Sequence, residues 1–204
     1  MNSNPRLAAG SLALLVLAVL NLSGCSGSSA PTGISPEKFA DGVYAVMKAD
    51  RTVYAQQIVT RLQKQGATKV VPLEEWKDWE DDWDYHALPL PAQVFRMGAS
   101  LVDENPDAGF RYSLKSLWPL NPQHKPQSDQ ERKALRYLVD NPGETKSIET
   151  TINGRKMFVK YFPDRAVAEA CWTCHNEHTN KEENYPEFKK NDVMGGVAVY
   201  IPLP

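Results

Sequence analysis

The chain has 204 residues, of which 42% are hydrophobic and 24% are charged. These proportions are typical of a globular protein and exclude a collagen, a coiled-coil array and a wholly disordered chain. Because 23 Lys and Arg stand against 25 Asp and Glu, the net charge is -2. A chain without a basic field is not expected to bind nucleic acid.

Residues 1–24 predict a bacterial export signal. Arg6 gives a short positive start, and the apolar stretch Leu12–Leu22 is too short for a permanent membrane helix. Leu-Ser-Gly before Cys25 is the pattern of a lipoprotein cleavage site, so we expect Cys25 to be acylated and to anchor the protein in the membrane. Ser26 after it favours the outer membrane, on the periplasmic side. An ordinary secreted protein and an uncleaved anchor are the alternatives.

Residues 25–35 then form the lipidated cysteine and a flexible tether, and residues 36–204 form one domain. The domain is expected to begin with a long helix over residues 36–65. Ser35 can cap this helix, Pro36 suits its first turn and Gly66 can end it. Its predicted apolar stripe consists of Val43, Met47, Tyr54, Ile58 and Leu62.

The segment Leu73–His86 combines tryptophans at helical spacing with many acidic residues. Trp76, Trp79 and Trp83 could share one helical face. The surrounding acidic patch over residues 74–84 could dock a basic redox partner. The alternative is a short helix that packs its tryptophans inward and leaves a solvated acidic face.

The rest of the chain predicts an α+β domain with an antiparallel sheet. The expected elements are a proline corner at 88–91, a helix over 92–101, a strand over 110–117, a loop over 119–130, a helix over 131–140, a hairpin of 147–152 and 156–162, and a last strand over 195–202. Asn153-Gly154 between the hairpin strands predicts a type I′ turn, because both turn positions need positive φ.

The strongest chemical signal is the motif Cys171-Trp172-Thr173-Cys174-His175. C-x-x-C-H is the attachment motif of a c-type haem. Cys171 and Cys174 can form thioethers with two vinyl groups on one porphyrin edge, and His175 can bind the iron as the proximal ligand. The alternatives are a redox disulfide, for which no thioredoxin-like pattern is present, and a zinc site with His178, which lacks the usual separation between ligand pairs.

The sixth iron ligand is left open by the sequence. His86 and Met47 are the main candidates, since imidazole and thioether both bind haem iron. Tyr54 and an open or water-bound position are the others, and His178 lies too close to His175 to reach the opposite face of the ring. The ordinary roles of a lone Met and a lone His are core packing and hydrogen bonding.

Several further segments accompany the haem motif in a fixed order. They are Asp50-Arg51-Thr52-Val53-Tyr54 with Ile58-Val59, Leu88 to Ala92, Phe110 to Leu117, the set Pro119, Asn121, Pro122, Pro126, Glu131 and Leu135, and Gly195 to Leu203. In this order they resemble the c-type haem proteins with a PAS-like fold of cyanobacteria and proteobacteria, over about residues 36–203. That domain also serves as the periplasmic haem sensor of chemoreceptors and histidine kinases.

The resemblance implies a PAS-like five-stranded antiparallel sheet with a long N-terminal helix. It also implies one covalent haem c, with His175 as proximal ligand. Some members use an N-terminal cysteine as the distal ligand, whereas this chain has no cysteine between Cys25 and the haem motif. His124 stands in a loop where a small polar residue such as Asn is expected, which adds it to the candidate ligands.

Two functions compete at this point. The first is electron transfer or redox buffering by an exported monohaem lipoprotein with a redox protein as partner. The alternative is a stand-alone sensor of redox state or of a diatomic gas that acts through a separate protein. A peroxidase-like enzyme is not expected, because no distal acid–base pair can be placed near the iron.

Overall fold

The computed structural model describes residues 33–66, 69–71 and 87–204, and residues from Ile34 to Pro204 form one compact unit. The chain enters this unit through a long helical segment made of α1 (Pro36–Val53), the π-helix η1 (Tyr54–Val59) and α2 (Thr60–Lys64). The Ser35 side chain accepts from the backbone N–H of Lys38, and Gly66 follows the last turn with φ +63°. Both ends of the predicted helix are therefore confirmed.

The π-helix η1 changes which side chains of this segment are buried. Before it, Ala40, Tyr44 and Met47 pack toward the sheet; within it, Ala55 and Val59 are the buried residues. One extra residue in a turn rotates the following positions by about 100°. At Ile58 the predicted stripe is wrong for this reason, whereas Tyr54 and Leu62 are half-buried.

Ile58 belongs to the predicted stripe but is 37% exposed, and its neighbour Val59 takes the buried position. The hydroxyl of Thr60 donates to the carbonyl oxygen of Ala55 at 2.7 Å, within the same widened stretch. A strict 3.6-residue repeat cannot include a widened turn. The sequence pattern therefore predicts that Ile58 is buried, whereas Val59 is the buried residue.

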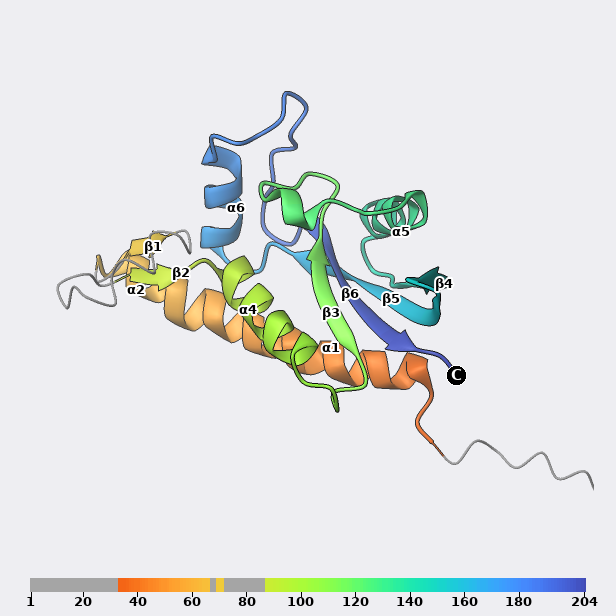
Figure 1. Ribbon diagram of the computed structural model, residues 1–204. Coiled ribbons are helices and arrows are strands. Elements are labelled where there is room, and N and C mark those ends of the chain that lie inside the picture. The colour runs from red at the N-terminus through yellow and green to blue at the C-terminus, as the bar shows by residue number, and fades with distance from the viewer. Residues whose placement is uncertain (1–32, 67–68, 72–86) are drawn as a thin grey trace, which may run out of the picture. The chain divides into compact units, whose positions relative to one another are not determined.

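A four-stranded antiparallel sheet forms the centre of the unit (Figure 1). Its order is β3 (Arg111–Lys115), β6 (Val193–Pro202), β5 (Arg155–Arg165) and β4 (Lys146–Ile152). The last strand in the chain, β6, therefore lies between two strands that precede it. It is buried from Val193 to Tyr200, because helices cover the sheet on both faces.

Side chains of the two central strands alternate between these faces. Phe162, Val197 and Val199 pack against α1 and α4 (Pro91–Asp103). On the opposite face, Val159, Tyr161, Ala198 and Tyr200 pack against α5 (Asp129–Asp140). Alternate residues of the last strand therefore belong to two hydrophobic layers, one on each face of the sheet.

The predicted hairpin and helices are confirmed with small shifts of their ends. β4 and β5 pair in register from Ile152–Arg155 outward, and Asn153 and Gly154 have φ of 50° and 77°, as a type I′ turn needs. The loop before α5 contains a single 3₁₀ turn, η3 (Pro122–His124), and Ser128 caps α5. The segment after β5, for which the pattern predicts no element, forms α6 (Glu169–Glu177).

The five-stranded sheet is not confirmed. The described part of the chain contributes four strands to the main sheet, and the short strands β1 (Lys69–Val71) and β2 (Ala87–Pro89) pair with each other in parallel as a separate sheet. The predicted signal with Cys25, the acidic patch 74–84 and His86 lie outside the described residues. Among the helices that are described, none is long and apolar enough to cross a membrane.

Candidate functional site

The helix α6 carries the whole C-x-x-C-H motif (Figure 1). It lies in the connection between the two central strands, β5 and β6. Two backbone hydrogen bonds close the base of this connection, from Ala166 N–H to the Asp192 oxygen at 3.0 Å and from Asn191 N–H to the Ala166 oxygen at 2.9 Å. The position of the motif is therefore fixed by the most extensively paired part of the sheet.

The motif spacing places its three chemical groups together. Cys171, Cys174 and His175 stand at i, i+3 and i+4, which share one face of a helix. Both cysteines are free thiols, Cys171 half-buried and Cys174 exposed. Burial raises the pKa of each thiol above its usual value, so both are protonated at neutral pH.

His175 is held by an aromatic residue that the sequence analysis missed. Its Nδ1 lies 2.6 Å from the phenol oxygen of Tyr185, and its ring meets Phe188 edge-on with the ring centroids 5.9 Å apart. We assign the ring proton to Nδ1, which then donates to Tyr185 and leaves the lone pair of Nε2 free. Burial raises the pKa of Tyr185, so this partner remains a neutral phenol.

The charge state of His175 suits a metal ligand. Burial lowers its pKa from 6.5 to about 4, and the positive charge of Arg51 adds to the effect. The imidazole is therefore neutral at physiological pH. A neutral imidazole whose Nδ1 is hydrogen-bonded presents Nε2 in the form that metal ions bind.

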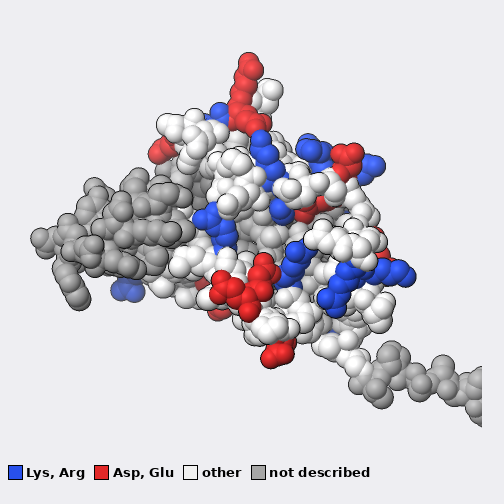
Figure 2. All heavy atoms as spheres, in the orientation of Figure 1, with Lys and Arg blue, Asp and Glu red and all other residues white. Residues whose placement is uncertain are grey.

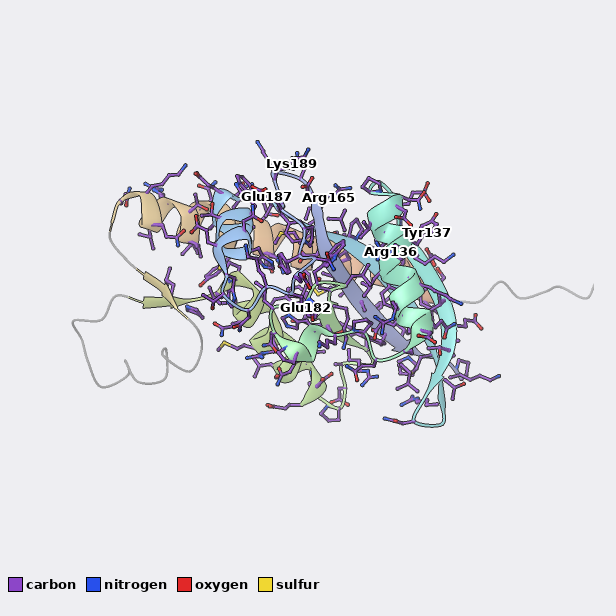
Figure 3. The ribbon with its side chains drawn as sticks, turned by 90° about the horizontal axis from the view of Figure 1, so that it is seen from above. Arg136, Tyr137, Arg165, Glu182, Glu187 and Lys189 are labelled. Carbon is purple, nitrogen blue, oxygen red and sulfur yellow. The ribbon has the colours of Figure 1, made fainter. Side chains whose placement is uncertain are left out.

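The loop that carries Tyr185 is tied to α6 by the side chain of Asn176. Asn176 Oδ1 accepts from the Phe188 N–H at 2.9 Å, and its Nδ2 donates to the Phe188 oxygen at 2.7 Å. Phe188 is buried in a small cluster with Ala166 and Met194, against which Cys171 packs. In Figure 3, Glu182, Glu187 and Lys189 mark the course of this loop around α6.

The candidate sixth ligands differ in their surroundings. Met47 is partly buried on α1, where it packs against the cluster of Phe162 and Val197. Tyr54 donates its hydroxyl to the Pro89 carbonyl oxygen at 2.8 Å and is thus engaged in holding β2. The Nδ1 of His178 accepts from the Asn180 N–H at 3.0 Å at the end of α6.

His124 shares an electrostatic environment with His175. Burial lowers the pKa of His124 from 6.5 to about 4, with further contributions from Arg96, Lys115 and Arg51. The positive charge of Arg51 contributes to the lowered pKa of both His124 and His175. The backbone of His124 is fixed by Ser116, whose N–H donates to the His124 oxygen at 2.9 Å.

Arg51 is the second residue that the sequence analysis missed as a functional side chain. Its Nη2 lies 3.0 Å from Oδ2 of Asp164, and both side chains are largely buried, with 14% and 13% exposed. Its guanidinium carbon lies 5.8 Å from the centroid of the Phe95 ring. A charged residue one turn after Met47, on the inward face of the helix, is the signal that could have found it.

A cavity beside this ion pair reaches the start of α6. Its lining includes Met47, Arg51 and Phe95 from the helices, and Asp164 and Val167 from the segment that leads into α6. Gln56 of η1 donates its side-chain N–H to the Val167 oxygen at 2.8 Å. The helical segment and the motif helix are therefore neighbours at this cavity.

The residues present fit a haem. The donor set consists of two thiols and a neutral imidazole on one helix face, as covalent attachment with iron ligation requires. Within the described residues, no group of three His, Cys, Asp or Glu side chains could hold a metal ion alone. The Nη1 atom of Arg51 is buried and has no hydrogen-bond partner in the part of the chain that the structure describes.

The charged surface of the unit is mixed. On the face seen in Figure 2, lysine and arginine side chains alternate with aspartate and glutamate, and no single sign dominates. Such a surface gives little long-range steering of a charged partner.

Comparison with known proteins gives one family. A family model described as Tll0287-like matches residues 36–202, well over half of the chain. Among solved structures, the chain is similar to one titled "Crystal structure of the cyanobacterial heme-protein Tll0287", with 19% identity, 84% of this chain and 98% of that chain covered, and a TM-score of 0.46. A search of curated proteins finds no match.

Proposed function

The chain belongs to the Tll0287-like family, and from this premise we propose that it binds one haem covalently, as haem c. Cys171 and Cys174 form the two thioethers and His175 is the proximal iron ligand. The observation that carries this proposal is the shared face of α6, where both thiols stand beside an imidazole with Nδ1 satisfied and Nε2 free. The PAS-like character of the domain is part of the same proposal.

The residues around the motif have separate tasks in this proposal. Tyr185 holds the imidazole in one tautomer and one orientation. Phe188 and Trp118, whose ring centroids are 5.8 Å apart, exclude water from the proximal side. When bound, haem iron supplies a one-electron Fe(III)/Fe(II) couple.

We propose that this Fe(III)/Fe(II) couple serves electron transfer or redox buffering. The protein would be exported and anchored through acylated Cys25 at the periplasmic face of the outer membrane. The acidic patch over residues 74–84 would receive a basic redox partner. These assignments rest on the sequence patterns of residues 1–25 and 74–84.

The second candidate function is sensing of redox state or of a diatomic gas. The observation that favours it is the surroundings of Met47 and Tyr54, since one packs in the core and the other is hydrogen-bonded to Pro89. If neither binds iron, the sixth position is open to an external ligand unless another residue such as His86 or His124 occupies it.

Absorption spectra test the proposal and separate the two functions. The full chain is exported in cells that have the cytochrome c maturation proteins, and spectra are recorded oxidised, reduced, and reduced with CO. Reduced bands that CO leaves unchanged support an electron carrier, whereas immediate CO uptake supports a sensor. The variant His175→Ala should lose the wild-type spectrum, and an unchanged spectrum would refute the proximal assignment.

A further inference from the structure

Of the two terminal nitrogens of the Arg51 guanidinium, one has a partner and the other has none among the described residues. Nη2 lies against the Asp164 carboxylate at 3.0 Å, whereas Nη1 is buried and meets no acceptor among the residues that the structure describes. A buried donor of a charged group that has no partner destabilises the protein, because the group has lost its hydrogen bonds to water. An acceptor is therefore expected at this atom in the loaded protein.

The location of Nη1 limits what that acceptor can be. Arg51 lines the cavity that reaches Val167, two residues before α6, and apolar groups of Met47 and Phe95 line the same cavity. A haem is apolar around most of its rim. The hydrogen-bond acceptors that it brings are the oxygens of its two propionates and an oxygen of a small ligand on the iron.

We propose that Arg51 uses Nη1 to donate a hydrogen bond to an oxygen acceptor that arrives with the haem, while Asp164 holds Nη2. This inference rests on the proposed haem function. Asp164 is a positioning residue here, because its carboxylate fixes the orientation of the guanidinium fork. Arginine suits this task better than lysine, since its planar fork can serve two acceptors at once.

The two sources of the oxygen predict different effects of Arg51→Gln. A propionate that loses its cationic partner becomes a weaker acid, so the pH at which the reduction potential starts to change moves upward. An iron-bound oxygen that loses a donor instead raises the C–O stretching frequency of the ferrous CO complex. In both cases the loss of one positive charge beside the haem favours Fe(III) and lowers the potential.

The experiment compares wild type, Arg51→Gln and Arg61→Gln. Arg61 is exposed on α2 of the same helical segment, so its variant removes one positive charge away from the cavity. Haem staining of denatured protein comes first. If wild type carries no covalent haem, the proposed function fails before any variant is considered.

With haem present in all three proteins, the readouts are the potential as a function of pH and the C–O stretch. A lower potential in Arg51→Gln only, with a shifted pH dependence, supports the propionate; a lower potential with a raised C–O stretch supports the iron-bound oxygen. If Arg51→Gln matches Arg61→Gln in all readouts, the inference is overturned while haem binding stands.

Arg51→Lys keeps the inference testable if Arg51→Gln does not fold. Lysine retains the charge opposite Asp164, but its single ammonium group is not a fork for two acceptors. Because the charge is kept, we expect a potential near that of wild type, while the pH dependence or the C–O stretch shifts in the same direction as in Arg51→Gln and by a smaller amount. Values identical to wild type in every readout would refute the use of Nη1.

Discussion

At the scale of single residues, the site depends on partners that are distant in the sequence. His175 receives its hydrogen-bond partner from Tyr185 in the following loop, and Arg51 finds Asp164 across more than half of the chain. The sequence motif names the residues that we propose to hold the haem. The residues that set its properties come from the tertiary structure.

Tyr185→Phe removes the hydrogen bond on Nδ1 of His175 and keeps the ring. Without an acceptor on Nδ1, the imidazole is a weaker electron donor to iron, so Fe(II) is favoured and the reduction potential should rise. Potentiometric titration measures this change. Tyr137→Phe, which removes an exposed hydroxyl bonded to Glu144 instead, is the control and should leave the potential near that of wild type.

A fall in stability in mild acid is expected from His124. Its folded pKa of about 4 lies below the usual 6.5, so between these values the unfolded chain binds a proton that the folded chain does not. Stability is therefore present above about pH 6.5 and is lost as the pH falls toward 4. His124→Gln should reduce this loss by ~1–3 kcal/mol, as measured by urea unfolding across that range. An unchanged pH profile would argue against a buried His124.

At the scale of elements, the two faces of β6 are packed differently. On the side of α5, Gly196 allows close contact: a methyl group at this position would lie 2.8 Å from Leu135 Cδ2 and 3.0 Å from Leu138 Cδ1. Both leucines are fully buried, so they have little room to move. The distance between sheet and helix is thus set by a residue without a side chain.

Gly196→Ala should destabilise the protein by about 1–3 kcal/mol, because the added methyl group overpacks the contact with α5. Gly42→Ala is the matched control. Gly42 lies in α1 and has nothing within 4 Å of the added methyl group, so alanine should stabilise the helix by about 0.5–1 kcal/mol. Denaturant unfolding compares the two, and similar stabilities would contradict the described packing of α5.

The sequence predicts correctly those elements that are determined by neighbouring residues, such as turns and helix ends. Asn153-Gly154 predicts the hairpin, and Ser35, Pro36 and Gly66 predict the ends of the first helical segment. The widened η1 is missed, because a regular repeat assigns Ile58 to the core where Val59 lies.

The candidate site also contains residues that the sequence predicts and residues that only the structure identifies. Cys171, Cys174 and His175 follow from one contiguous motif, whereas Tyr185 is separated from it by a loop with no periodicity. Asp164 lies just beyond the strand predicted over 156–162, and its partner Arg51 stands in a helix far away in the sequence. Contacts between residues that are distant in the sequence cannot be predicted from a local sequence pattern.

At the scale of the whole molecule, the fold places the motif where the sheet is best supported. α6 sits in the connection between β5 and β6, and these strands pair from Met157–Pro202 to Arg165–Val193. Helices α1 and α4 cover one face of the sheet and α5 the other (Figure 1). A cofactor attached to α6 would therefore be held beside the two central strands of the sheet.

The central claim is that Cys171 and Cys174 hold one haem covalently. Mass spectrometry of the denatured, exported protein tests it directly. We predict an added mass of one haem that withstands acid–acetone extraction in wild type and is absent or extractable in the double variant Cys171→Ala, Cys174→Ala. A wild-type protein with no added mass, or with haem that the extraction removes, would contradict the claim.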